Sequence, residues 1–169
     1  MELVKSPNEW LEKTVDPFDF DKLDAKALEK EMIDLMIASD GIGLSANQVA
    51  LNAQIFVMRP IDMEGLTEPF AVINPKIIAV NQDEDGMVVG PEGCLSHPGL
   101  VLTVKRPKSL VAEFLDSDGN SRIINFVDIN ARCFAHEYDH LQGIEFTDRV
   151  SKLKLDMAKK KQKKRMRNG

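Results

Sequence analysis

Hydrophobic side chains recur at helical spacing in the first quarter of the chain. Leu28, Met32 and Met36 fall on one face of a helix over residues 23–39, and Asp24 is placed to cap its start. The methionines of this segment are expected to fill core space. The pattern therefore predicts an amphipathic helix packed on a core.

Two further helices are expected nearer the C-terminus. Residues 129–141 suit a helix that Gly143 would end. Another is expected from Val150 into the basic last residues. Short apolar runs bounded by proline, glycine and turn residues are typical of strands. They cover residues 54–58, 70–73, 100–104, 110–115 and 123–127, with a DSDGN turn between the last two. Strands in series followed by helices predict an α+β domain, not a doubly wound sheet.

Composition adds few constraints. The chain has 169 residues, 43% hydrophobic and 29% charged, which suits one globular domain. No apolar run is long enough to span a membrane, and the first residues lack the apolar core of a secretory signal. Only Cys94 and Cys133 supply thiols, so we expect a reducing, cytoplasmic setting. A monomer with no membrane or DNA partner is expected.

Charge is distributed unevenly along the chain. Of 27 acidic residues only Asp156 lies within residues 151–169, whereas nine of the 22 lysines and arginines lie there. Such a tail could bind nucleic acid electrostatically, or it could be a solvated helix end.

The most informative stretch is HEYDH at residues 136–140. Two imidazoles four residues apart lie on one helix face, about 6 Å apart along the axis, so His136 and His140 can reach one metal ion. Glu137 is placed to handle the protons of a water molecule at that ion. The pattern predicts metal-assisted hydrolysis of a carbonyl; two unrelated surface histidines are the alternative.

A catalytic metal needs a third ligand and an open position. Phe146 fills the downstream histidine position of one zinc protease group, and a phenyl ring cannot ligate. A metal ion held between His136 and His140 would lie several ångströms along the helix axis from Cys133, beyond the reach of its short side chain. Cys133 is therefore expected to pack or to form a pocket wall. Cys94, in a glycine- and proline-rich loop over residues 90–99, is favoured as the third ligand.

Three segments together resemble the peptide deformylase family. Its pattern GxGLAAxQ, EGCLS and HExDHLxG corresponds in order to GIGLSANQ (41–48), EGCLS (92–96) and HEYDHLQG (136–143). Alone, the first of these is a weak signal that also suits a plain helix-to-strand loop. The resemblance runs from about residue 6 to about residue 150. It implies antiparallel sheets around a central helix carrying HExxH, with an N-terminal and a C-terminal helix.

The chain departs from the family pattern at four positions. Ser45 stands where alanine is usual, Ala135 where glutamine is common, and Glu12 where arginine is frequent. His97 follows EGCLS, where an apolar residue is common. No departure removes an expected ligand or catalytic group. They concern the rim of the substrate site, and His97 is expected beside the ligands or at that rim.

The resemblance also implies the roles of individual residues. Cys94, His136 and His140 would hold one divalent ion, foremost Fe²⁺, with Zn²⁺, Ni²⁺ or Co²⁺ able to substitute; ligand chemistry alone favours zinc. Glu137 would accept a proton from the attacking water and then give it to the leaving amine. The carbonyl oxygen that gains negative charge during the attack would receive hydrogen bonds from the Gln48 amide and the Leu95 N–H.

The implied substrate is the N-formylmethionyl end of a nascent polypeptide, which yields formate. The methionine pocket and its backbone contacts are expected from Ile42, Gly43, Gly99, Ile129 and Cys133. Residues 1–150 would form the catalytic domain. Residues 151–169 would form a basic helix or tail that contacts ribosomal RNA. Glu92 and Arg106 either pair to hold the ligand loop or are both exposed.

Two other functions stay open. A metalloprotease would need a ligand after the helix, and Phe146 argues against one form of it. A zinc-stabilised adaptor would need a closed site with four protein ligands, supplied by Cys133 or His97.

Overall fold

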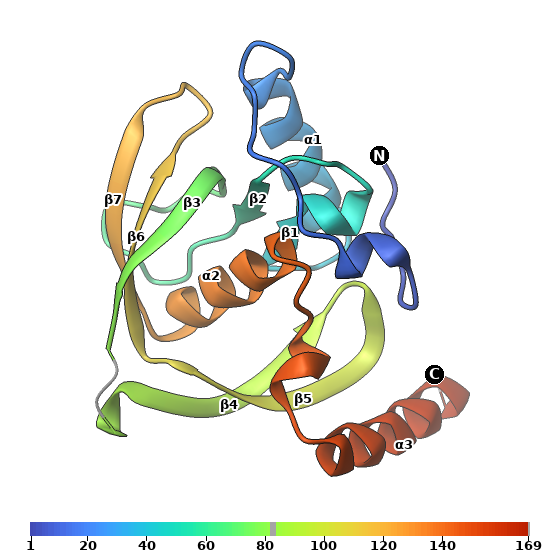
Figure 1. Cartoon of the computed structure of the whole chain (residues 1–169). Coiled ribbons are helices and arrows are strands. Elements are labelled where there is room, and N and C mark those ends of the chain that lie inside the picture. The colour runs from blue at the N-terminus through green and yellow to red at the C-terminus, as the bar shows by residue number, and fades with distance from the viewer. Residues whose placement is uncertain (82–83, 169) are drawn as a thin grey trace.

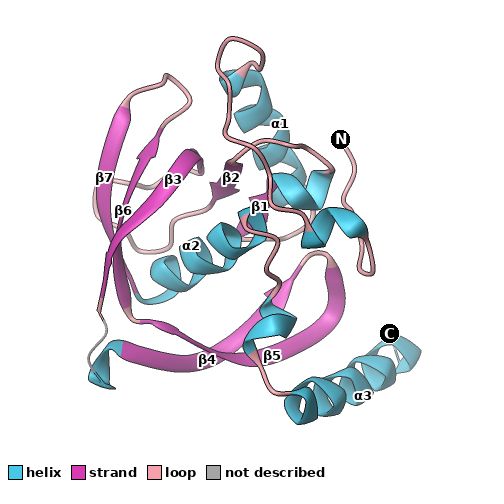
Figure 2. Ribbon diagram, in the orientation of Figure 1, coloured by secondary structure: helices cyan, strands magenta, loops and turns pink. Residues whose placement is uncertain are grey.

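Two antiparallel sheets enclose one helix. The computed structural model describes residues 1–81 and 84–168. One sheet has five strands and the other is a two-stranded hairpin. Figure 1 shows the helix α2 between them, and Figure 2 shows the same layers by secondary structure. The helices are η1 (Glu9–Glu12), α1 (Ala25–Ala38), η2 (Ala46–Val49), η3 (Glu84–Gly86), α2 (Asp128–Leu141), η4 (Phe146–Arg149) and α3 (Lys152–Asn168). The strands are β1 (Gly43–Ser45), β2 (Ile55–Met58), β3 (Phe70–Val80), β4 (Met87–Cys94), β5 (His97–Pro107), β6 (Ser109–Leu115) and β7 (Ser121–Val127).

The larger sheet has the order β1-β2-β3-β6-β7 and supplies most of the core. All four of its strand pairs are antiparallel. Phe134 of α2 packs its ring 5.1 Å from that of Phe56 and 4.9 Å from that of Phe126. Both partners lie on the sheet and are fully buried. These contacts fix α2 against the sheet, and α2 also contacts β5 of the hairpin and η2.

The second sheet consists of β4 and β5, which run beneath α2 in Figure 1. Leu100, Leu102 and Val104 alternate along β5 with exposed residues and bury their side chains with Phe146 of η4. The hairpin closes at a tip where Cys94 pairs with His97. The fold thereby brings the EGCLS segment to the side of the HEYDH helix.

The outer helices differ in how they pack. α1 buries Met32 and Met36 beside β1 and β2. α3 has no buried residue and lies along β5, standing away from the body in Figure 1. In the described part of the chain, no helix combines the length and the apolar character that a membrane span requires.

The fold class expected from the sequence is confirmed, and so are the three main helices. The structure differs from the expected strands in two places: β4 includes residues 90–94 of the segment expected to be a loop, and β1 is a strand that the sequence does not predict. β4 contains Gly90, Pro91 and Gly93, which are rare in strands, but proline is tolerated in a two-stranded sheet because both strands are edges. β1 has only three residues, too few for a periodic pattern to appear.

Candidate metal centre

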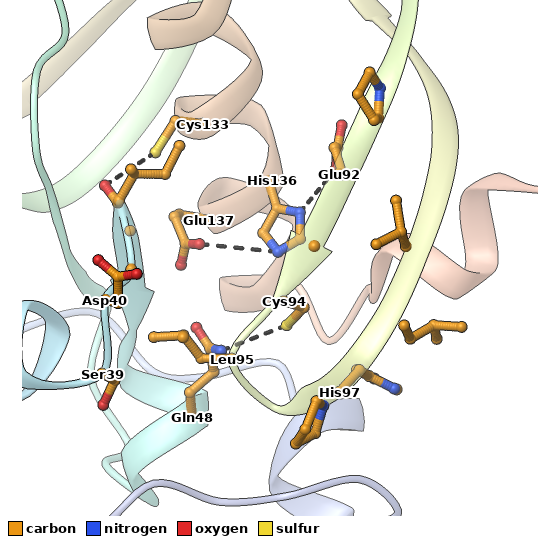
Figure 3. Close-up of a pocket in the computed structure, with 18 of the residues that line it drawn as sticks. Ser39, Asp40, Gln48, Glu92, Cys94, Leu95, His97, Cys133, His136 and Glu137 are labelled. Atoms are coloured by element: carbon orange, nitrogen blue, oxygen red, sulfur yellow. Dashed lines mark hydrogen bonds and ion pairs between the residues drawn. The ribbon is translucent and has the colours of Figure 1, made fainter. Parts of the chain in front are cut away.

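A sulfur and two imidazole nitrogens converge between α2 and the hairpin tip. The ligand atoms of Cys94, His136 and His140 all lie within 4.8 Å of one another. The Cys94 Sγ lies 3.6 Å from Nε2 of His140. Figure 3 shows the Cys94 and His136 side chains turned toward the same space. Separations of this size suit three ligands of one ion, because each bond to zinc is about 2.0–2.3 Å long.

Both histidines are prepared for ligation in different ways. His140 is completely buried, and burial lowers its pKa well below the usual value, so the ring is neutral. In His136, Nδ1 donates to Oε1 of Glu92 at 2.8 Å, which leaves Nε2 directed at the site. Such carboxylate partners fix the orientation of ligating imidazoles. Burial favours the neutral form of His136, but hydrogen bonds with Cys94 and Glu92 raise its pKa to about 10, so this ring gives up a proton when it becomes a ligand.

Glu92 is held by a buried network of charges. Arg106 binds it bidentately, with Nε to Oε2 at 2.9 Å and Nη2 to Oε1 at 3.0 Å. This resolves the alternative left open by the sequence: the two residues pair, and both are buried. Burial opposes ionisation, but the hydrogen bonds from His136 and Arg106 prevail and lower the pKa of Glu92 to about 2.

Three members of this network were not singled out from the sequence. Arg132 donates from Nη1 to Glu92 at 2.7 Å, and Arg106 donates from Nη1 to Asp139 at 2.6 Å. Arg149 also binds Asp139, at 2.8 Å. For Asp139, its position within the HEYDH motif was the only sequence feature that could have indicated a role at the site. The partners come from four different elements, and no sequence pattern reports such pairings.

Glu137 lies beside the ligands with one oxygen free. Its Oε1 is 3.9 Å from Nε2 of His136, and its buried Oε2 has no hydrogen-bond partner in the described structure. Burial raises the pKa of Glu137 to about 7. A Cβ added to Gly43 would meet the Glu137 Cγ at 2.8 Å, so glycine lets β1 lie directly against this carboxylate. A carboxyl group that titrates near neutrality can accept and return a proton.

The Gln48 amide is oriented toward the site by its own segment. Its Oε1 accepts from the backbone N–H of Ser45 at 3.0 Å and from the Ser45 hydroxyl at 3.3 Å. Its Nε2 therefore faces the hairpin tip, 3.2 Å from Oγ of Ser96 and 3.5 Å from Sγ of Cys94. Ser45, one of the departures from the family pattern, thus adds a hydrogen bond to a predicted catalytic residue.

Leu95 occupies the turn immediately after Cys94. Its carbonyl accepts from Nζ of Lys5 at 3.1 Å, and the next carbonyl, of Ser96, accepts from the Ser6 backbone N–H at 2.8 Å. The N-terminal segment thus lies along the turn. Fixing the Cys94 ligand also fixes the Leu95 N–H, because the two are adjacent in the chain.

A cavity of about 700 Å³ opens at this site. The predicted substrate-binding residues Ile42, Gly43, Gly99, Ile129 and Cys133 all line it, together with Gln48, Glu137 and His136. Ile42 and Ile129 are partly exposed there, whereas Cys133 is buried and directs its thiol to the Ile42 carbonyl at 3.4 Å. Their part in substrate binding stays a prediction.

The residues that a closed site would need are engaged elsewhere. His97 binds Glu145 through Nε2 at 2.6 Å and does not join the group of candidate ligands among the described residues. The Cys133 thiol points to a carbonyl group. Phe146 is buried with its ring 5.5 Å from that of His136, so it packs behind a ligand. The three-residue set favours an open metal site.

This arrangement is typical of metal hydrolases that keep one position for the reacting groups. Comparison with known proteins indicates which family of metal hydrolases the chain resembles. A family model described as Polypeptide deformylase matches residues 1–156. A peptide deformylase of Rhodopseudomonas palustris is 36% identical over 99% of this chain and 95% of its own length. The chloroplastic peptide deformylase 1B of rice is 38% identical over 89% of this chain, which spans only 55% of that protein.

Solved structures agree with the sequence matches. A crystal structure of a peptide deformylase from Legionella pneumophila superimposes with a TM-score of 0.86 at 31% identity, covering 98% of this chain and 95% of that one. The chain therefore belongs to the polypeptide deformylase family, whose members are hydrolases.

Proposed function

We propose that this protein removes the formyl group from the N-terminal formylmethionine of nascent polypeptides and releases formate. The observation that supports this most is the convergence of Cys94, His136 and His140 beside Glu137, in a chain of the polypeptide deformylase family. Cys94 would ligate as a thiolate and both histidines as neutral rings. The side chain of the formylmethionine would enter the cavity toward Ile129.

The donor set fits one divalent ion. When bound, such an ion polarises a carbonyl oxygen and acidifies water. Proton transfer and stabilisation of the developing charge are assigned to side-chain and backbone groups of the chain. Glu137 takes the proton of the attacking water through its free oxygen and later delivers it to the leaving amine. Gln48 Nε2 and the Leu95 N–H donate to the oxygen that gains charge, and both are fixed before substrate arrives.

The test is formate release from formyl-Met-Ala-Ser by anaerobically prepared protein. Glu137→Gln keeps the size of the side chain but cannot accept the proton, so kcat should fall by about 10²–10⁴-fold. Glu113→Gln, at the exposed position of β6, is the matched control and should retain full activity. Equal kcat in the two variants would contradict the role of Glu137. Firm metal binding without any formate release would favour a non-enzymatic adaptor.

We propose Fe²⁺ as the native ion, with Zn²⁺, Ni²⁺ or Co²⁺ able to replace it. Both cysteines are free, and a thiolate ligand needs reducing conditions, which supports a cytoplasmic setting. The iron form should lose activity in air, whereas the nickel form should keep it. Equal loss of both would argue that oxidation of Cys94, rather than of the ion, inactivates the protein.

The basic tail is proposed to contact ribosomal RNA. Gln162 and Arg165 of α3 donate to the carbonyls of Pro98 and Gly99 on β5. Lys160, Lys164 and Arg167 are exposed and, by helix geometry, lie around α3 on the side away from Gln162. Because α3 touches the cavity rim, deletion of residues 155–169 would disturb the substrate cavity as well as remove the basic charges. Substitution of exposed lysines tests the electrostatic role alone.

A further inference from the structure

The hairpin tip that carries Cys94 is anchored on both of its arms. On the β4 arm, Glu92 accepts from His136 two residues before Cys94. On the β5 arm, His97 is the register partner of Cys94 across a two-residue turn. The ligand lies between these points, so movement of either arm moves the sulfur.

The second anchor is a short hydrogen bond in a protected place. Nε2 of His97 lies 2.6 Å from Oε1 of Glu145, and the two side chains are only 10% and 13% exposed. The His97 ring packs edge-on against Phe146 at 5.3 Å, and Phe146 lies against His136. The backbone N–H of Glu145 in turn donates to Asp148 at 2.9 Å, which fixes the acceptor. Hydrogen bonds to an ionised group are about twice as strong as neutral ones.

Glu145 belongs to the polypeptide that carries the imidazole ligands. It follows α2 after the Gly143 turn and is the N-cap residue of η4. The hydrogen bond therefore joins the thiol side of the site to the imidazole side. Hydrogen bonds from Lys5, Ser6 and Gln48 link the tip to the N-terminal segment and to η2. Those from α3 reach the neighbouring carbonyls of Pro98 and Gly99.

We propose that His97 and Glu145 are positioning residues that hold Cys94 in ligating geometry and so slow the loss of the metal ion. The inference rests on the proposed metal centre. An apolar residue, common in the family at the position of His97, could fill the space beside Phe146 but could not form this link. His97 provides both the packing against Phe146 and the hydrogen bond to Glu145.

The test follows cobalt release from Co²⁺-loaded protein after addition of excess chelator. The near-ultraviolet absorption of the thiolate–cobalt bond reports Cys94 ligation directly. In His97→Val and in Glu145→Ala, release should be about tenfold faster, the lower end of the effect of losing a partner outside the ligand shell. The double variant should release no faster than either single one, because both lose the same hydrogen bond.

Three controls separate positioning from general stability. His97→Gln places an N–H near the position of Nε2 and should restore most of the retention. Glu145→Gln keeps the acceptor without its charge and should be intermediate. Lys26→Met breaks an exposed 2.7 Å ion pair with Asp118 and should leave release unchanged. Thermal unfolding of the metal-free variants shows whether any of them is merely unstable.

Wild-type release rates in the His97 and Glu145 variants, or additive effects in the double variant, would overturn the inference. Faster release with no rescue by His97→Gln would also overturn it, because packing alone would then explain the effect. Wild-type protein that binds no cobalt would overturn the metal centre itself. Formate release is measured separately, so firm cobalt binding without hydrolysis would reject the proposed function only.

Discussion

The two sides of the metal centre are built differently. On one side, His136 and His140 stand one turn apart on α2, a helix that is buried over most of its length. On the other side, Cys94 lies half-exposed at the tip of a hairpin of only two strands. The spacing of the imidazoles follows from helix geometry, whereas the place of the sulfur depends on contacts made across the fold.

This difference explains where the supporting interactions lie. The imidazole side needs orientation only, which Glu92 gives to His136. The thiol side needs both location and orientation, and it receives hydrogen bonds from an N-terminal segment, from Gln48 and through His97. A local motif can therefore specify two ligands, but the third requires the whole domain.

The largest effect is expected from removal of a ligand. Cys94→Ala, His136→Ala and His140→Ala should each weaken metal binding by more than the roughly 100-fold upper limit for an outer partner. Cys133→Ala is the matched control, because its thiol faces a carbonyl group and should not affect metal content. Metal content after equilibrium dialysis measures this. Loss of metal in Cys133→Ala together with retention in Cys94→Ala would assign the thiol ligand to α2.

The next largest effect should follow a break in the charge network that joins the two sides. Arg106→Met leaves Glu92 and Asp139 buried without their shared partner, so the free energy of unfolding should fall by about 3–5 kcal/mol. Lys30→Met removes an exposed pair with Asp34 and should leave the free energy of unfolding nearly unchanged, because solvent screens such a pair. Urea unfolding of the metal-free proteins compares them. Similar losses in both would show that the buried network adds no more than a surface pair.

A smaller effect separates Gln48 from the residue that orients it. Gln48→Ala removes an oxyanion donor and should lower kcat by about 10²–10³-fold. Ser45→Ala removes only the 3.3 Å hydroxyl contact while the Ser45 N–H remains, so kcat should fall about twofold, corresponding to about 0.5 kcal/mol. Steady-state formate release measures both. An equally large loss in Ser45→Ala would mean that the hydroxyl group itself sets the amide position.

The smallest effect on catalysis is expected at α3. Replacement of Lys160, Lys164 and Arg167 by glutamine should leave kcat on short formyl peptides unchanged. The salt dependence of ribosome binding should weaken, with the slope of log K against log salt reduced by about 1 for each charge that contacts a phosphate. An unchanged slope would mean that the tail is a solvated helix end.

Local patterns predicted much of the site and less of the hairpin. The α2 helix and its imidazoles are apparent because helical periodicity acts over a few residues. The sequence does not predict β4, because Gly90, Pro91 and Gly93 favour loops. Pairing with β5 stabilises this strand, and such pairing depends on residues distant in the sequence. The sequence left the pairing of Glu92 with Arg106 open. The two residues are 14 positions apart and do not lie opposite each other across the strands, since Glu92 is opposite Leu102 and Arg106 is opposite Val88. His97 could be recognised as a departure, but its partner could not.

X-ray absorption of the metal-loaded protein tests the metal centre most directly. For the zinc form we expect one sulfur at about 2.3 Å, two nitrogens at about 2.0–2.1 Å and one further light atom. Cys94→Ala should lose the sulfur contribution, whereas Cys133→Ala should keep it. A wild-type spectrum without sulfur, with two sulfurs, or with three imidazole nitrogens would contradict the proposed site.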